Sequence, residues 1–441
     1  MKPRKERPSV DRLTRRGCLA IVTPPQRYRL LALFIAGWIS TSLTLTQVRA
    51  QSLAEYVPMD PIPQIVELPN PCDNPTTRMW GPEDMLGNLN YLTPERVRDN
   101  LNLIRLGRIY QLAHTVEPGQ MGFNAFYDFT IHTGEWPGRG TSRNIVNNEE
   151  TLGHSTYNRN SAGVFAAAIG TQFDALTHMT QGGVTYNCFD TRDPAFHLLP
   201  EGDPGDLPKG NSGDDYIFRG YSKGGVENVG TIVARAILID VGQLLREREA
   251  AAGRDPNQFP PPDYEFSPEE LEQALIRQDM TIEDIHPGDA LLFRIGWGAR
   301  YWTSNPADPR NESQKYFNGG QEEFLPNSPG LDPRAVQWTI NRMPVLVGAD
   351  NTSVESSLLG PIGFEKRGHL SWLSSGIYMI EDLDLEELAA DCETERTANM
   401  AEYGRPTQPD SEETCYTFTL IVQTIPTRGF TGSTVAPTAI R

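Results

Sequence analysis

The sequence predicts an α/β fold, because short apolar stretches with strand character alternate with segments that carry helix signals along most of the chain. Val, Ile and Leu dominate the predicted strands, whereas three of the four predicted helices begin at Ser, Thr or Asp followed by Pro. The chain has 441 residues, of which 38% are hydrophobic and 22% are charged. This is an ordinary globular composition, and it excludes wholesale disorder and a multi-span membrane protein.

Residues 1–50 are predicted to form a cleaved signal peptide. A pair of arginines precedes an apolar run of about ten residues, from Leu30 to Ile39, and a Ser/Thr-rich stretch then ends at Ala50. A membrane anchor would need about 20 apolar residues. We therefore expect cleavage after Ala50, export to the periplasm or the cell exterior, and no stable membrane insertion of the mature chain.

The remainder of the chain is predicted to contain three segments. Residues 51–77 are rich in proline and form an N-terminal arm. Residues 78–425 contain the alternating strands and helices and form one α/β domain. Residues 426–441 are predicted to be a C-terminal tail.

The distribution of charge argues against nucleic acid as a partner. Residues 1–50 hold ten of the 39 Lys and Arg residues but only two of the 57 Asp and Glu residues, which leaves a formal charge of −26 on the rest of the chain. A body with this charge repels phosphate backbones and anionic lipid surfaces.

Four cysteines remain after removal of the signal peptide: Cys72, Cys188, Cys392 and Cys415. An even number in an oxidising compartment permits up to two disulfides, with three possible pairings. We favour a bond between Cys392 and Cys415, because both lie in the C-terminal region and can close a short loop. Free buried thiols are the alternative.

Several helix starts are marked by capping chemistry. Thr93, followed by Pro94 and an acidic residue, begins the first predicted helix. A capping box begins the helix predicted over residues 267–275. Two further helices are predicted over residues 241–249 and 332–340.

Strands are predicted where short apolar runs occur. These runs span residues 109–113, 164–169, 232–239, 290–295, 345–347, 377–380 and 418–422. Three intervening segments are rich in Gly, Pro, Asp and Asn and are predicted to be loops. These loops span residues 200–228, 250–262 and 300–330.

A candidate site follows the predicted strand at residues 164–169. Gly170 allows a close approach of the backbone. Gln172 and Asp174 are two positions apart and share a face in an extended chain, and a turn can return His178 toward them. Oxygen and nitrogen donors that converge in this way can hold a divalent cation. An aspartate that caps a helix is the alternative explanation of the same residues.

A second candidate patch extends from His369 to Glu381. Glu381 ends an apolar run of strand character, and α/β enzymes usually present polar groups from such strand ends. A helix cap or a solvated acid is the alternative explanation for Glu381.

Together the two patches resemble the cyclase superfamily that includes kynurenine formamidase and isatin hydrolase. The family pattern is His-x-Gly-Thr-His-x-Asp-x-Pro-x-His, followed far downstream by a His and a Glu twelve residues apart. His369 and Glu381 reproduce this downstream pair. Four residues of the first patch stand in register with the pattern, namely Gly170, Thr171, Asp174 and His178.

Three further segments are similar to family segments and occur in the same order, at residues 80–84, 288–297 and 348–355. The likeness extends over residues 78–425. It implies a mixed β-sheet or barrel-like core flanked by helices, and it implies assembly as a homodimer or a higher homo-oligomer.

The resemblance also implies a metal site. When the family's roles are carried over residue by residue, Asp174, His369 and Glu381 become metal ligands. His178 becomes the catalytic acid and base, and Glu381 is also counted among the catalytic residues. The implied metal is Mn²⁺ or Zn²⁺, with Mg²⁺ as a further option, because a ligand set rich in oxygen favours Mn²⁺ and Mg²⁺.

The chain departs from the family pattern at three positions, where Ala168 and Gln172 replace histidines and Leu176 replaces proline. Gln172 is expected to ligate the metal through its amide oxygen, which is a weaker donor than imidazole. The missing side chain at Ala168 predicts one metal ion instead of two.

The activity that the resemblance implies is hydrolysis of a C–N bond in a small linear or cyclic amide, as an arylformamidase or isatin hydrolase performs. Two other functions remain open. One is a binding protein of the same fold that holds little or no metal, and the other is a lyase or ring-closing enzyme that acts on a small carbonyl compound.

Overall fold

The computed structural model describes residues 72, 79–115, 170–179, 184–190, 193, 196, 221–262, 264–300, 328–356, 367–408 and 414–441. All of them belong to one compact unit, Met59–Arg441. The predicted signal peptide, nearly all of the predicted arm and the strand predicted at residues 164–169 lie outside the described residues.

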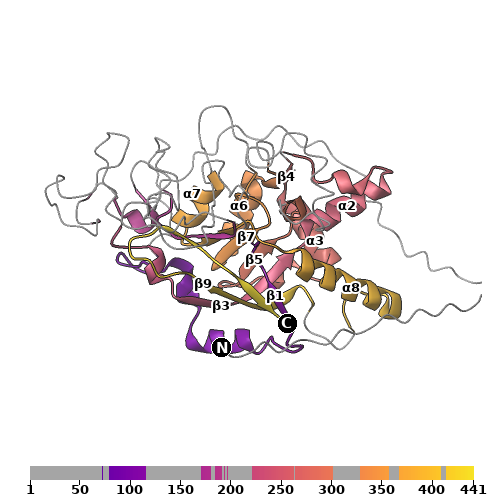
Figure 1. Ribbon diagram of the computed structural model, residues 1–441, viewed down its shortest axis with the longest axis horizontal. Coiled ribbons are helices and arrows are strands. Elements are labelled where there is room, and N and C mark those ends of the chain that lie inside the picture. The colour runs from indigo at the N-terminus through magenta and orange to yellow at the C-terminus, as the bar shows by residue number, and fades with distance from the viewer. Residues whose placement is uncertain are drawn as a thin grey trace, which may run out of the picture. The chain divides into compact units, whose positions relative to one another are not determined.

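A curled sheet of nine strands forms the centre of this unit (Figure 1). Across the sheet the strands are β1 (Ile109–Gln111), β11 (Thr438–Ile440), β9 (Thr417–Gln423), β3 (Thr231–Ile239), β5 (Ala290–Phe293), β7 (Leu346–Ala349), β8 (Tyr378–Glu381), β2 (Gln172–Asp174) and β10 (Gly432–Thr434). A separate parallel pair consists of β4 (Glu265–Phe266) and β6 (Gly330–Leu331).

The direction of the strands decides where polar groups gather. The four neighbouring strands β3, β5, β7 and β8 are parallel, so that their carboxyl ends lie at one edge of the sheet. β2 runs antiparallel to β8 and pairs Gln172 with Glu381. The first residue of β2 therefore lies beside the last residue of β8, at the edge where α/β sheets present functional groups.

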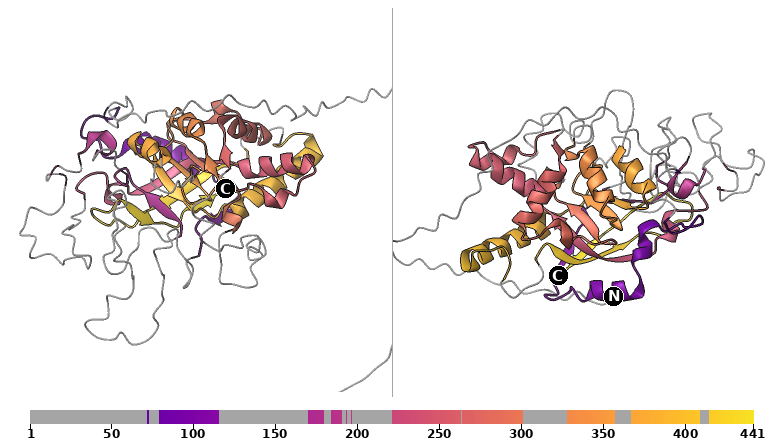
Figure 2. Two further views of the ribbon diagram at one scale, coloured as in Figure 1. Left: turned by 90° about the horizontal axis from the view of Figure 1, so that it is seen from above. Right: turned by 180° about the vertical axis from the view of Figure 1, so that it is seen from behind.

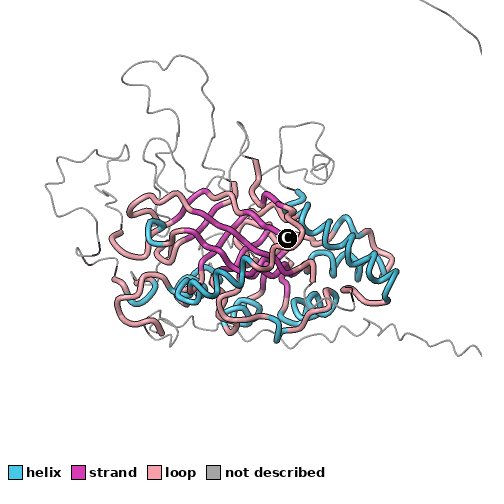
Figure 3. Tube along the Cα trace, turned by 90° about the horizontal axis from the view of Figure 1, so that it is seen from below, coloured by secondary structure: helices cyan, strands magenta, loops and turns pink. Residues whose placement is uncertain are grey.

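Helices flank the sheet. They are α1 (Pro94–Leu101), α2 (Val241–Ala251), α3 (Pro268–Arg277), α6 (Pro333–Ile340), α7 (Arg367–Ser374) and α8 (Glu386–Tyr403). Short 3-10 helices span Gly87–Tyr91, Tyr186–Cys188, Val226–Asn228, Pro256–Gln258, Ile282–Asp284 and Gly298–Arg300. The labelled helices α2, α3, α6 and α7 lie on one side of β3 and β9 in Figure 1, and the view from behind in Figure 2 agrees. Figure 3 shows the strands at the centre, with helices mainly to their right and below them.

The predicted apolar runs form the centre of the core. Every residue of β5, β7 and β8 is buried, as expected for parallel strands covered on both faces. β3 is fully buried in its second half, while its first half alternates between buried and more exposed residues. The α/β prediction is therefore confirmed.

The predicted helix starts are also confirmed. Thr93 accepts a hydrogen bond from the Arg96 amide at the start of α1. Ser267 and Glu270 form the predicted capping box of α3. Asp332 accepts a hydrogen bond from the Ala335 amide at the start of α6. These side chains satisfy amide groups that have no partner within the first helical turn.

The prediction of a C-terminal tail is wrong. Within residues 426–441, β10 pairs with β2, and β11 pairs with both β1 and β9. β10 and β11 have three residues each and few bulky apolar side chains, so that their sequences carry little strand signal. β10 and β11 form because neighbouring strands offer backbone N–H and C=O groups with which they pair.

Helix α8 was not predicted, because its buried positions form a thin stripe in a largely polar segment. The buried residues of α8 are Leu388, Ala389, Cys392 and Asn399. At 18 residues it is the longest described helix. Among the described residues, no helix combines the length and the apolar character that a membrane crossing requires.

The four cysteines that follow residue 50 form two disulfides. Cys392 in α8 bonds to Cys415, which confirms the favoured pairing, and Cys72 bonds to Cys188. The alternative of free buried thiols is therefore wrong. The first bond joins α8 to the segment that leads into β9, and the second joins the predicted N-terminal arm to the domain.

Replacing both Cys392 and Cys415 with Ala should lower the free energy of unfolding by about 3 kcal/mol, because the bond closes a loop across a sequence separation of 23 residues. Urea unfolding of the variant and the wild type, both non-reduced, measures this difference. An unchanged unfolding midpoint would show that the bond contributes no stability.

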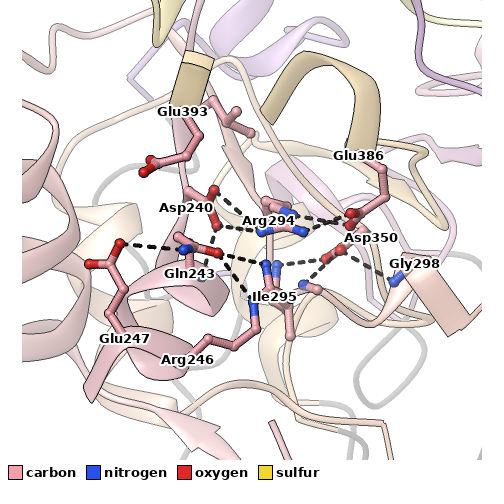
Figure 4. A network of polar contacts seen from close by, with 12 residues as sticks. Asp240, Gln243, Arg246, Glu247, Arg294, Ile295, Gly298, Asp350, Glu386 and Glu393 are labelled. Atoms are coloured by element: carbon pink, nitrogen blue, oxygen red, sulfur yellow. Dashed lines mark hydrogen bonds and ion pairs between the residues drawn. The ribbon is translucent and has the colours of Figure 1, made fainter. Parts of the chain in front are cut away.

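A partly buried ionic network joins three elements at the carboxyl edge of the sheet (Figure 4). Arg294 follows β5, and its guanidinium donates to Asp240 Oδ1 at 3.1 Å and to Glu386 Oε2 at 2.7 Å. Asp240 directly follows β3 and caps α2, and Glu386 begins α8. Arg294 therefore fixes the position of α8 relative to the strand ends.

Asp350, which follows β7, holds the loop after β5. Its carboxylate accepts hydrogen bonds from the amides of Ile295, Gly296 and Gly298 at 2.7, 2.8 and 3.2 Å (Figure 4). Burial, with a further contribution from the charge of Glu386, raises the pKa of Asp350 to about 7. The positive charge of Arg294 and the backbone hydrogen bonds oppose this rise in the pKa but do not cancel it.

The raised pKa predicts a pH-dependent contribution to stability. An unfolded aspartate has a pKa of about 3.9, so that between about pH 4 and 7 the native chain binds a proton that the unfolded chain does not. The contribution is fully present below pH 4 and is lost as the pH rises through 7. Relative to Asp350→Asn, the wild type should gain up to about 1.4 kcal/mol per pH unit as the pH falls from 7 to 5. Urea unfolding at each pH measures the difference, and a constant difference would contradict the prediction.

Candidate metal centre

The residues that precede β2 anchor it to the end of β8. Gly170 has a φ of +64°, a conformation that glycine adopts without steric cost. The Thr171 hydroxyl donates to the carbonyl oxygen of Asp382 at 2.5 Å and accepts from the amide of His114 at 3.0 Å. The Gly-Thr pair of the sequence pattern thus sets the path of the chain into β2.

Gln172 and Asp174 are both buried in β2, an extended segment of the kind in which their two-residue spacing places them on one face. The Gln172 amide nitrogen donates a hydrogen bond to Glu381 Oε2 across the β2–β8 pair. Glu381 ends β8 and is also buried. The strand register therefore brings these polar side chains together inside the protein.

A tight turn brings His178 back to Asp174. The His178 amide donates to the carbonyl oxygen of Ala175 at 2.8 Å, and the Thr177 hydroxyl donates to the carbonyl oxygen of Gly224 at 3.1 Å. His178 Nδ1 lies 3.5 Å from Asp174 Oδ1. The His178 side chain is 11% exposed, which leaves part of its ring accessible.

His369 approaches from α7, a helix that the sequence analysis did not predict. Its Nε2 atom lies 2.7 Å from Glu381 Oε1 and 3.7 Å from Asp174 Oδ2. The His369 side chain is 1% exposed. Its ring centroid lies 6.4 Å from that of His178, so the two imidazoles lie near each other at the same site.

The structure thus brings together the two patches that the sequence analysis selected. Asp174, His369 and Glu381 each offer one ligand atom, and these atoms lie within 4.8 Å of one another. β2, α7 and β8 supply them. His178 lies beside Asp174 and outside this group of three.

The charges of the site fit a bound cation. Asp174 and Glu381 are buried acids, and a third, Glu355, lies 2.7 Å from His369 Nδ1. Even with both imidazoles protonated, three carboxylates would carry the larger charge, and buried charge is costly without compensation. Carboxylate oxygens are ligands that Mn²⁺ and Mg²⁺ prefer, and an imidazole nitrogen is a ligand that suits Zn²⁺.

Gln172 has a contact that the sequence analysis did not predict. Its amide nitrogen holds Glu381, while its buried Oε1 atom has no hydrogen-bond partner among the described residues. An acceptor oxygen in this condition fits a neighbouring cation, so ligation by Gln172 stays a prediction. Ala168 lies outside the described residues, and the predicted single metal ion also stays a prediction.

Glu355 is the site residue that sequence reasoning missed. It lies in the loop after β7, where residues 348–355 were matched to a family segment without any role for this acid. No local spacing connects Glu355 to His369. The one available signal was an acid at the end of a segment that follows a parallel strand.

The chain is similar to proteins of a known family and to several solved structures. The family model described as "Putative cyclase" matches residues 110–356. None of the curated proteins matches the chain. Among solved structures, a crystal structure described as a novel cyclase shares 24% identity, covers 82% of this chain and 98% of its own, and has a TM-score of 0.52.

Two isatin hydrolase structures are more distant. One, bound to the product analogue thioisatinate, has 16% identity, covers 63% of this chain and 72% of its own, and has a TM-score of 0.33. The other, isatin hydrolase A from Ralstonia solanacearum, has 15% identity, covers 76% of this chain and 92% of its own, and has a TM-score of 0.36.

Proposed function

Because the chain belongs to the cyclase family, we propose that it is a metal-dependent hydrolase that cleaves the C–N bond of a small linear or cyclic amide. One observation carries this proposal: Asp174, His369 and Glu381 offer buried ligand atoms within 4.8 Å of one another. These three residues would hold the cation, and Gln172 Oε1 is available as a further neutral donor.

The chemistry requires an activated water and a polarised carbonyl. A bound divalent cation supplies both, because it polarises the carbonyl oxygen and lowers the pKa of water. Asp174 faces His178 Nδ1, so we assign the proton transfer to His178 Nε2. This atom takes the proton of the attacking water, the C–O bond forms, the C–N bond breaks, and the proton passes to the leaving nitrogen.

The test combines metal analysis with a substrate panel. The protein is purified without chelator, its metal content is measured, and N-formyl anilines, isatin-like lactams and lactones are offered with added Mn²⁺. We expect a stoichiometric metal ion. A lactam should give one ring-opened product heavier than the substrate by one water, and a linear amide should give an acid and an amine whose summed mass exceeds that of the substrate by one water. A comparison of Mn²⁺, Zn²⁺ and Mg²⁺ identifies the ion that supports the highest activity.

Two other outcomes would favour other functions. The replacement of a family histidine by Gln172 favours a binding protein with weak or no metal. Absence of bound metal at saturating Mn²⁺ or Zn²⁺ would support that function and contradict hydrolysis. A product lighter than the substrate by one water, or of equal mass, would instead support a ring-closing enzyme or a lyase.

We further propose that the protein is exported after removal of residues 1–50 and acts in the periplasm or outside the cell. The two disulfides support this location, because such bonds persist in oxidising compartments. Mass spectrometry of the N-terminus of the protein recovered from the expressing cells tests it, since we expect the chain to begin at Gln51. The homodimer stays a prediction.

A further inference from the structure

Glu355 contacts His369 through a single carboxylate oxygen. Glu355 Oε1 lies 2.7 Å from His369 Nδ1 and accepts a hydrogen bond from the His369 amide at 3.2 Å. One oxygen therefore constrains both the backbone and the ring of the histidine. Glu355 itself is 6% exposed.

We propose that Glu355 is a positioning residue that holds His369 with Nε2 directed at Asp174 and Glu381. A carboxylate is an acceptor, so its contact with Nδ1 favours the tautomer that carries a proton on that nitrogen. The lone pair of Nε2 is then available on the side of the other two ligands. This inference rests on the proposed metal site.

The surrounding structure holds Glu355 firmly in place. The Ser353 hydroxyl donates to the Glu355 carbonyl oxygen at 2.8 Å, and a β-bridge pairs Glu355 with Leu331 in β6. A Cβ atom added at Gly368 would lie 2.6 Å from Glu355 Oε2. The carboxylate thus packs against the backbone just before His369, where a larger residue would disturb it.

The position of the Glu355 carboxylate indicates a role beyond that of a helix cap. Glu355 does lie near the beginning of α7 and accepts an amide hydrogen bond there, which a structural role would explain. A neutral side chain would serve that purpose without adding a third acid beside Asp174 and Glu381. A carboxylate on Nδ1 makes the opposite ring nitrogen a stronger metal donor, and this accounts for the charge.

The experiment measures metal affinity and stability separately. The purified protein is stripped with a chelator and dialysed, and Mn²⁺ is titrated by calorimetry into the wild type, Glu355→Ala and Glu355→Gln. Thermal unfolding of each metal-free protein is recorded in parallel. Glu249→Ala is the matched control, because Glu249 is a buried acid in α2 whose ionic partners are Arg248 and Arg254.

We expect Glu355→Ala to weaken Mn²⁺ binding by about 10–100-fold. Glu355→Gln should lose less affinity, because its amide oxygen still accepts from Nδ1, and its similar shape protects the fold. Glu249→Ala should alter unfolding but not Mn²⁺ affinity. Wild-type affinity in both Glu355 variants, with altered unfolding alone, would overturn the positioning role and leave the metal site intact. Absence of binding in the wild type would overturn the metal site and this inference together.

Discussion

Asp174→Ala should weaken metal binding by about 100-fold and sharply lower hydrolysis. Asp174 lies between the two histidines, 3.5 Å from His178 Nδ1 and 3.7 Å from His369 Nε2. Its removal deletes an anionic ligand and leaves His178 without the carboxylate that faces Nδ1. If a site of three or four ligands supplies about 10 kcal/mol, one ligand contributes roughly 3 kcal/mol, a loss of about 100-fold in affinity.

Calorimetric titration with Mn²⁺ and turnover at saturating Mn²⁺ measure the two losses. Asp332→Ala is a suitable control, because it removes a buried aspartate that caps α6 and costs about 1 kcal/mol of stability. That variant should bind Mn²⁺ as the wild type does. Unchanged metal affinity in Asp174→Ala would contradict the proposed metal site.

His178→Ala should lower kcat by about 10²–10⁴-fold and leave the metal content nearly unchanged. The reason is geometric, since His178 faces Asp174 but lies outside the group of three ligand atoms. Turnover on the best substrate of the panel and elemental analysis of the same preparation measure the two quantities. The limb of the pH–rate profile that depends on the base should also disappear.

His286→Ala is the control for this experiment. His286 is 55% exposed and interacts with Asp289, so its loss removes an imidazole without touching the site. Full activity is expected for this variant. Retained activity in His178→Ala would assign the proton transfer to another group, and a parallel loss of metal would place His178 among the ligands.

The sequence predicted the parts of the fold that depend on local physics. Continuous apolar runs became β5, β7 and β8, and the capping residues Thr93 and Ser267 began α1 and α3. The strands β10 and β11 depend instead on pairing with distant segments. A sequence of three residues with modest hydrophobicity does not predict such pairing.

The site was predictable to a similar extent. Asp174 and His178 are close in sequence, and the resemblance to a known family connected them to His369 and Glu381. The contacts of Gln172 and Glu355 were not predictable, because they follow from the β2–β8 register and from the loop after β7. Such contacts join residues that are far apart in the sequence, and no spacing along the chain predicts them.

The pairing of β2 with β8 also determines when the protein can acquire its ion. Gln172 and Glu381 are 209 positions apart, and their strands meet near one side of the completed sheet, where, among the described strands, only β10 lies beyond β2. An unfolded chain therefore has no chelating pocket, and ion capture follows folding and adds its free energy to the native state. A chain that crosses a membrane unfolded would be loaded with the metal of the compartment in which it folds.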